Sequence, residues 1–219
     1  MVFLHAGSGS SRMWEHQVPD FTGAGYRFIA YDRRSEGISS EDLEALAAHL
    51  GLERFHLVGT AAGGIVAVDY ALTHSERLRS LVIANSIVGV QDVEYLEMSR
   101  RLRPPEFASL PVEMRELGPS YRAINPEGTR RWKDLAKPGH PSAQGTKNRI
   151  TFSALETIRA PTLLVTGDAD LYTPPAVLRL FAARIPNCES VVVPECGHSA
   201  FWEQPETFNR IVLDFLSKH

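Results

Sequence analysis

Three short segments of the sequence carry groups that together could act on a carbonyl compound. Residues 55–65 contain an apolar run, a turn flanked by Gly59 and Gly63, and the start of a helix. The other two segments bring Asp170 and His198, each just after a strand-like run. A carboxylate that holds one imidazole nitrogen fixes the tautomer and lets the other nitrogen act as a base. An acid and a histidine behind successive strands lie where open α/β sheets keep their chemistry.

The turn at residues 59–63 has the spacing of a nucleophile elbow, G-x-S-x-G. Its glycines let the central residue occupy a strained turn without a steric clash, and the helix that follows directs free N–H groups at whatever binds there. The central residue is Ala61, which has no atom that can attack a carbonyl; such a loss costs on the order of 10⁶ in turnover. Thr60, one position off the apex, points the wrong way to substitute. Either a serine was replaced here to trap a ligand, or this lineage has no nucleophile at this position.

The acid that orients the histidine is either Asp168 or Asp170. Asp168 suits a turn, whereas Asp170 lies further past the strand end, so we expect Asp170 to hold His198. Near the N-terminus, the small-residue loop at residues 4–10 could join its backbone N–H groups to that of Ala62 and stabilise an oxyanion. The order elbow, acid, histidine is that of a hydrolase triad.

The elements that must position these residues are strands that alternate with helices. Six apolar runs read as strands, and their continuous hydrophobicity predicts that they are covered on both faces. They are residues 2–4, 27–31, 55–58, 81–84, 162–165 and 191–193.

Helical spacing of apolar residues lies between these runs and after them. It is seen at residues 43–50, where Ser40 is placed to cap the helix, and behind Pro205 at the end of the chain. Alternation of this kind builds a parallel sheet with helices on both sides, so the predicted fold class is α/β.

Residues 86–150 break this alternation. They contain no convincing strand, half of the 14 prolines fall between residues 104 and 141, and helical patterns appear at residues 93–102 and after Pro111. We expect a helical insertion that covers the strand ends; a long surface excursion without a role is the alternative. Residues 139–147 are rich in Gly, Pro and Ser and predict a mobile loop.

Composition excludes several classes of protein. The 219 residues, 43% hydrophobic and 22% charged, fit one ordinary globular domain or one domain with an insertion. A net charge of −3 argues against nucleic-acid binding, and no apolar stretch has the length of a membrane span. The start lacks the pattern of a signal peptide. Cys188 and Cys196 flank a strand and lie too far apart to bridge, so we expect free thiols and a cytoplasmic protein.

Neither a metal nor a cofactor is indicated. No pair of His, Cys, Asp or Glu has the spacing of metal ligands, and the glycines at 7 and 9 lack the remainder of a dinucleotide fingerprint. The expected partner is a small-molecule substrate, and the sequence does not indicate an oligomeric state.

Together these segments resemble the α/β-hydrolase fold superfamily, in particular its lidded esterases, enol-lactonases and C–C bond hydrolases. The resemblance runs across nearly the whole chain. It is carried by residues 4–7 with 12–14, 31–34, 59–64, 167–170, and 197–199 with 202–205.

The resemblance assigns roles to particular residues. It makes Asp170 the acid, His198 the base and Ala61 the residue at the nucleophile position. Its oxyanion hole would be the backbone N–H groups of Gly7 and Ala62.

The resemblance also divides the chain. Residues 1–85 and 151–219 would form the α/β-hydrolase core, and residues 86–150 the helical cap that shapes the substrate pocket. Aromatic residues are candidates for the pocket wall, with simple packing as the alternative: Trp14, Tyr121 and Tyr172.

The sequence departs from the family at two further places. It begins at the strand before the oxyanion loop, where family members usually have two earlier strands, and residues 34–39 form a short connection in which Ser35 and Glu36 replace the expected small and aromatic residues. We expect the strand edge left open at the start to be covered by a partner or by residues outside the given sequence.

The sequence therefore predicts a hydrolase of a small ester, lactone or related carbonyl substrate. Two alternatives stay open. The His198–Asp170 pair could act alone as a base in lyase or cofactor-free oxygenase chemistry, or the chain could be a non-catalytic binder that keeps the pocket.

Overall fold

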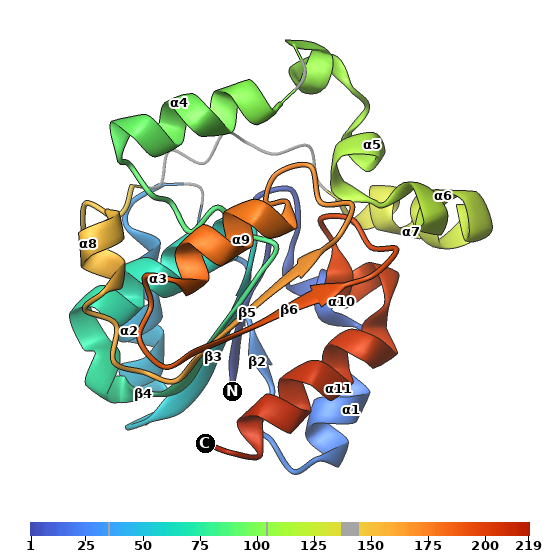
Figure 1. Cartoon of the computed structure of the whole chain (residues 1–219). Helices are drawn as coiled ribbons and strands as arrows, with labels where there is room; N and C mark the ends of the chain where they lie inside the picture. Colours follow the sequence, from blue (N-terminus) through green and yellow to red (C-terminus); the bar gives the residue numbers. More distant parts are fainter. Residues whose placement is uncertain (35, 104, 137–144) are drawn as a thin grey trace.

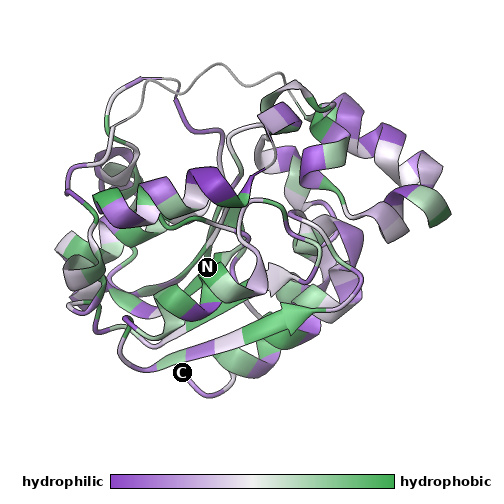
Figure 2. Ribbon diagram, turned by 45° about the horizontal axis from the view of Figure 1, so that its top comes forward, coloured by the Kyte–Doolittle hydropathy of each residue, from purple (hydrophilic) through white to green (hydrophobic). Residues whose placement is uncertain are grey.

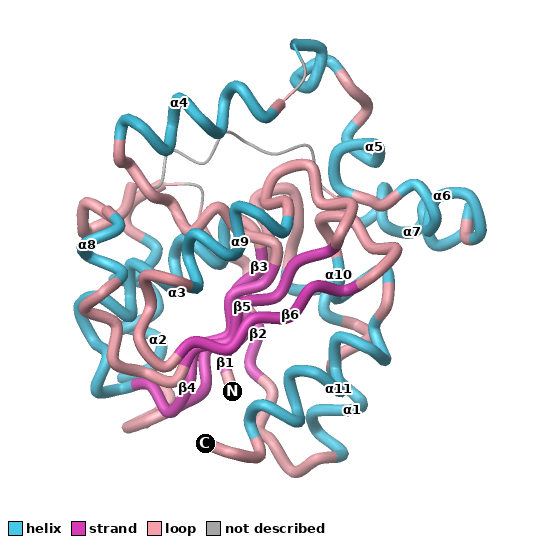
Figure 3. The backbone as a smooth tube through the Cα atoms, in the orientation of Figure 1, coloured by secondary structure: helices cyan, strands magenta, loops and turns pink. Residues whose placement is uncertain are grey.

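The predicted strands form one parallel sheet (Figure 1). The computed structural model describes residues 1–34, 36–103, 105–136 and 145–219, and in these residues six strands pair in the order β2-β1-β3-β4-β5-β6. Every pairing is parallel, and Figure 3 shows the strands side by side with helices around them. The strands are β1 (Val2–Leu4), β2 (Ile29–Ala30), β3 (Phe55–Thr60), β4 (Leu78–Ala84), β5 (Thr162–Gly167) and β6 (Cys188–Val193). The predicted fold class is confirmed.

Helices cover both faces of this sheet (Figure 1). The first face carries α2 (Ser39–His49), α3 (Ala62–His74), α8 (Phe152–Leu155) and α9 (Pro175–Ala182). The second carries α1 (Val18–Gly23), α10 (Ala200–Glu203) and α11 (Pro205–Leu216), with the 3-10 turn η1 (Ser11–Trp14). Another 3-10 turn, η2 (Ser75–Arg77), follows α3.

The alternation of side chains along each strand separates two hydrophobic cores. In β1, Val2 and Leu4 pack with the helices of the first face, whereas Phe3 packs with those of the second. Figure 2 shows much hydrophobic colour along the strands and mixed colours along the helices that cover them. Because both faces are covered, the inner strands β1, β3, β4 and β5 are buried at all or nearly all positions.

The two edge strands differ from the prediction of burial on both faces. Both residues of β2 are only half-buried, and in β6 Glu189, Ser190 and Val192 are exposed. An edge strand has a neighbour on one side only, and the helices pack mainly over the centre of the sheet. Continuous hydrophobicity in the run 191–193 therefore did not mean complete burial.

The predicted cap of α2 is also wrong. Ile38 occupies the N-cap position, and no side chain caps the helix. The Ser40 hydroxyl instead donates a hydrogen bond of 2.5 Å to the buried carboxylate of Asp69 on α3. A buried carboxylate needs donors more than a solvent-facing helix end does, so tertiary contact outweighs the local preference.

Within residues 86–150, the described part of the chain forms several short helices between Val93 and Leu135, joined by turns and loops. The helices are α4 (Val93–Leu102), η3 (Pro105–Ser109), α5 (Val112–Glu116), α6 (Pro119–Ile124) and α7 (Pro126–Leu135). The predicted helix at 93–102 is confirmed. Most of the loop predicted at 139–147 lies outside the described residues; of its last residues, Gly145 forms an isolated bridge with Ile38.

This inserted segment contacts both layers of helices. Tyr95 of α4 packs against the Phe152 and Phe181 rings of the first core, and Tyr121 and Trp132 of α6 and α7 belong to the second core. In Figure 1, α4 and the pair α6–α7 accordingly lie on different sides of the carboxyl ends of the strands.

Candidate active site

The elbow between β3 and α3 is built by close backbone contacts. A Cβ on Gly59 would lie 2.4 Å from the Gly63 carbonyl oxygen, and one on Gly63 would lie 2.2 Å from the Leu4 carbonyl oxygen. No side chain fits at either position. Between them Ala61 has φ 48° and ψ −115°, a conformation that residues other than glycine seldom adopt. The structure therefore holds Ala61 at a strained apex, and the Ser86 hydroxyl fixes it by donating to its carbonyl at 2.7 Å.

Asp170 and His198 form a buried pair. The ring Nδ1 of His198 lies 2.9 Å from each carboxylate oxygen of Asp170. The carboxylate also accepts hydrogen bonds from the backbone N–H groups of Tyr172 and Thr173 and from the Thr166 hydroxyl. Nδ1 is thus held by the acid, and Nε2 remains available on the other side of the ring.

Opposite charges outweigh the cost of burial in this pair. Burial alone raises the pKa of Asp170, but the charge of His198 and several hydrogen bonds hold that pKa at about 2. Burial alone lowers the pKa of His198, but the carboxylates of Asp170 and Glu116 lift it above its ordinary value. The pair therefore favours an ionised acid beside a ring that binds a proton readily.

The choice between the two aspartates is settled by where each side chain bonds. Asp168 accepts a hydrogen bond of 3.2 Å from the backbone N–H of Cys196 and so fixes the turn before the histidine. Asp170, two residues on, holds the His198 ring. This is the arrangement that the sequence predicts.

A cavity of about 240 Å³ lies at the carboxyl ends of the strands. Its walls include Ala61, His198, Gly7 and Ala62. The Ala62 N–H stands at the first residue of α3, where a helix offers no acceptor. The elbow, the imidazole of His198 and the two residues predicted to hold an oxyanion therefore line the same cavity.

Of the three aromatic residues predicted for the pocket, one lines it. The Tyr172 ring lies 4.3 Å from the His198 ring, centroid to centroid, and forms part of the cavity wall. Trp14 and Tyr121 do not line this cavity, because both pack into the second core, Trp14 against Phe201. Sequence patterns alone do not separate an aromatic wall from an aromatic core.

Three polar residues near the site, Asn85, Glu116 and Glu203, were not assigned a role from the sequence. Asn85, just after β4, donates from Nδ2 to Asp170 and to the Gly197 carbonyl, both at 3.1 Å. Glu116, at the end of α5, lines the cavity beside His198. A polar residue directly after a strand was a signal for Asn85, whereas nothing in its neighbourhood distinguished Glu116.

Glu203 on α10 joins the histidine loop to the inserted segment. Its carboxylate accepts from the backbone N–H groups of Gly197 at 2.9 Å, Ser199 at 3.1 Å and Gly118 at 2.8 Å. Burial is the main cause that raises the pKa of Glu203, and the three hydrogen bonds oppose it. One buried carboxylate thus fixes the backbone on both sides of His198.

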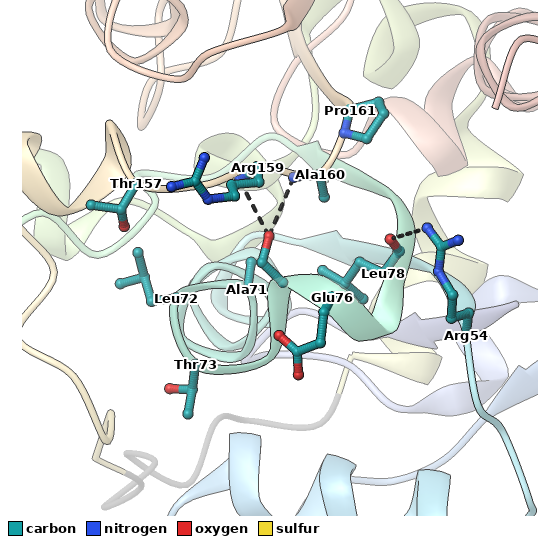
Figure 4. Close-up of a pocket in the computed structure, with 11 residues that line it drawn as sticks. Arg54, Ala71, Leu72, Thr73, Glu76, Leu78, Thr157, Arg159, Ala160 and Pro161 are labelled. Atoms are coloured by element: carbon teal, nitrogen blue, oxygen red, sulfur yellow. Dashed lines mark hydrogen bonds between the residues drawn. The ribbon is translucent and has the colours of Figure 1, made fainter.

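A second cavity, of about 460 Å³, lies at the amino ends of the strands (Figure 4). The Ser75 hydroxyl accepts hydrogen bonds from the backbone N–H groups of Arg159 and Ala160, at 3.2 and 3.3 Å, and Figure 4 shows dashed lines that end at these two residues. Arg54 bonds to the Leu78 carbonyl at 3.3 Å. The Ser75 contacts stabilise the start of β5 and the Arg54 contact the start of β4. The described residues that line this cavity include no histidine.

Some broader properties of the chain follow from the structure. Within the described ranges, no helix is long and apolar enough to cross a membrane. Cys188 and Cys196 are both unpaired. The described residues contain no cluster of three or more His, Cys, Asp or Glu side chains that could hold a metal ion.

The profile of the alpha/beta hydrolase family matches residues 1–211. The chain belongs to this family, which confirms the resemblance noted in the sequence.

Individual relatives are hydrolases. The chain is 31% identical to a 2-hydroxy-6-oxononadienedioate/2-hydroxy-6-oxononatrienedioate hydrolase of Paraburkholderia phymatum, over 100% of this chain and 87% of that protein. Its fold matches a thermophilic esterase from Thermogutta terrifontis with a TM-score of 0.83 and 26% identity, over 99% of this chain and 89% of the other. It also matches the enol-lactonase from Burkholderia xenovorans with a TM-score of 0.80, over 99% and 90%; at 20% identity this likeness shows the fold alone. The chain is therefore a member of a family of hydrolases, which is the class of enzyme that the sequence predicts.

Proposed function

We propose that this site hydrolyses a small ester, lactone or related carbonyl compound by means of His198, Asp170 and a nucleophile at position 61. The observation that carries the proposal is the buried pair itself. His198 Nδ1 is 2.9 Å from Asp170, and the same ring lines one cavity with the elbow. The names of two relatives, a dienedioate hydrolase and an esterase, support carbonyl hydrolysis as the class.

The proposed mechanism has two halves. A serine hydroxyl at the elbow attacks the carbonyl carbon while His198 takes its proton, and the N–H groups of Gly7 and Ala62 stabilise the oxyanion. When the intermediate collapses, His198 gives that proton to the leaving group and an acyl-enzyme remains. Water then repeats the attack with His198 again as base, which releases the carboxylic acid and the serine.

Ala61 stops this sequence at its first step. Its methyl group cannot form the acyl bond, so the chain as given is expected to bind the substrate without turning it over through an acyl-enzyme. Because the backbone at the elbow is already bent, a hydroxyl added at this position is expected to stand at the apex.

We further propose that residues 86–150 act as a cap on a core of residues 1–85 and 151–219. Ile87 and Glu116, both from this segment, form part of the cavity wall and support that role. A small molecule is the partner that a cavity of about 240 Å³ would accept. The two free thiols fit the cytoplasm as its compartment.

The test is to install Ala61→Ser and measure hydrolysis of p-nitrophenyl esters of increasing acyl length. We expect turnover to rise by on the order of 10⁴ or more over the Ala61 protein. A double variant, Ala61→Ser with His198→Ala, is the control and is expected to lose that gain. If a folded Ala61→Ser protein hydrolyses none of the esters, the proposal is wrong.

A second candidate function rests on the fact that the Asp170–His198 pair is intact although position 61 is alanine. A dyad of this kind can abstract a proton from a bound substrate without a serine. In that case the unmodified protein would already be active, and His198→Ala would abolish the activity. If the chain is instead a non-catalytic binder, ligand affinity would survive the loss of His198.

A further inference from the structure

Glu116 approaches His198 in two ways. Its backbone carbonyl accepts a hydrogen bond of 3.0 Å from the backbone N–H of His198. Its carboxylate oxygen Oε2 lies 4.0 Å from the imidazole nitrogen Nε2 of His198. Only 12% of the Glu116 side chain is exposed, and it forms part of the cavity wall. The inserted segment therefore places a carboxylate against the ring nitrogen that Asp170 does not occupy.

The charged groups around His198 are mainly acidic. Asp170 contacts Nδ1, Glu116 faces Nε2, and Glu203 on α10 bonds to the backbone on both sides of the histidine. The neutral but titratable groups nearby are Tyr172, whose ring lies 4.3 Å from the imidazole at an interplanar angle of 35°, and buried Cys196. Among the described residues, those that line the cavity include no lysine or arginine.

Two arginines lie one layer further out. The guanidinium of Arg103 stacks over the rings of Phe107 and Tyr172, each at 5.4 Å, and that of Arg115 lies 5.9 Å from Phe107. These two arginines are thus held against aromatic rings beside the site.

We propose that Glu116 is a positioning residue that stabilises the protonated ring of His198 through Nε2, so that the cap helps to set the pH at which this base becomes available. An opposite charge within about 4–6 Å favours the charged form of a titratable group by about one pH unit or more. Glu116 meets that condition with only 12% of its side chain exposed, and the His198 side chain is 5% exposed, so solvent screens the two charges weakly.

The effect of the Glu116 charge on the pH dependence of activity rests on the proposed function, and its direction follows from the role of His198 as a base. His198 must be neutral to take a proton, so raising its pKa removes activity over a wider range on the acid side. Removing the Glu116 charge is therefore expected to lower the pKa of His198 and to extend activity toward lower pH.

The direct test is an NMR titration of the imidazole in the protein as it stands. With Ala61 in place, no nucleophile complicates the ring signals, and the other seven histidines serve as internal references. We expect Glu116→Gln to lower the pKa of His198 by about one unit. Glu113→Gln is the matched control, because it removes a charge from the same helix at a residue paired with Lys133.

Several results would overturn the proposal. One is an unchanged His198 pKa in a folded Glu116→Gln protein, and another is an equal shift in both glutamine variants, since this would mean a general effect of net charge. If Glu116→Gln does not fold, Glu116→Asp keeps the charge on a shorter side chain. It is then expected to shift the pKa in the same direction by less, and no shift would equally contradict the proposal.

A second measurement separates this inference from the proposed function. In the Ala61→Ser protein, the acid limb of the pH profile of kcat/KM is expected to move down by the same amount when Glu116→Gln is added. If the Ala61→Ser protein hydrolyses none of the esters, the hydrolase function is overturned, whereas the NMR result still stands. An NMR shift without movement of the acid limb in an active enzyme would overturn the role of Glu116 in base availability.

Discussion

Two cavities lie at opposite ends of the same strands. The one at the amino ends has about twice the volume of the one at the carboxyl ends, 460 against 240 Å³. Its arginines, Arg54 and Arg159, are exposed, and its Ser75 hydroxyl is already bonded to two backbone N–H groups. The smaller cavity instead holds a buried histidine between two carboxylates. Volume therefore does not identify a site; convergent buried groups do.

The difference follows from the direction of the strands. In a parallel sheet all carboxyl ends meet at one edge, so the loops after β1, β3, β4, β5 and β6 bring their side chains together there. At the opposite edge the chain enters each strand, and the contacts in Figure 4 fix backbone rather than present reactive groups. The comparison predicts that substitutions have the largest effects at the Asp170–His198 pair and the smallest at the larger cavity.

The largest expected effect is on turnover. In the Ala61→Ser protein, Asp170→Asn is expected to reduce kcat by about 10⁴-fold, because an amide cannot hold the imidazole in the required tautomer. Arg159→Ala, in the larger cavity, is expected to leave kcat unchanged. Steady-state hydrolysis of p-nitrophenyl acetate measures both, and similar losses in the two variants would erase the distinction between the cavities.

The next effect is on stability at the elbow. Gly63→Ala places a methyl group 2.2 Å from the Leu4 carbonyl oxygen, and neither backbone can move away freely. We expect the free energy of unfolding to fall by about 3 kcal/mol, the upper part of the range for overpacking. Gly23→Ala is the control, since a Cβ there has no neighbour within 4 Å. Urea unfolding of the two variants checks this, and equal midpoints would contradict it.

A smaller loss of stability is expected when the Glu203 carboxylate, which bonds to the backbone on both sides of His198, is changed. Glu203→Gln turns one acceptor oxygen into an NH₂ group that faces backbone donors, which should cost about 2 kcal/mol at neutral pH. Glu206→Gln, at an exposed position one turn along, is expected to change little. Thermal unfolding measures both variants. A Glu203→Gln protein as stable as the parent would show that these bonds do not hold the loop.

The smallest effect belongs to the larger cavity. Ser75→Ala leaves the N–H groups of Arg159 and Ala160 without their acceptor, at a cost of about 1 kcal/mol in the free energy of unfolding. The pKa of His198, followed by NMR, is expected to stay where it is. A change in that pKa would mean that the two ends of the sheet are coupled.

Local pattern was sufficient to predict the six strands and the histidine–aspartate pair, because strand ends in an α/β chain converge by topology. It was not sufficient for contacts between distant segments. Glu116 is brought to His198 by the packing of the inserted helices, and Ser40 meets Asp69 only once α2 lies on α3. Trp14 shows the same limit, since a buried core position and a pocket wall have the same hydrophobic signature in sequence.

The conformation of Ala61 has a consequence for the history of this site. An alanine in this region of φ and ψ costs about 1–3 kcal/mol, and the surrounding glycines enforce it although no catalytic atom is present. Alanine and serine codons differ by a single base. A lineage with this backbone can therefore gain or lose its nucleophile in one mutational step, with the costly geometry retained throughout.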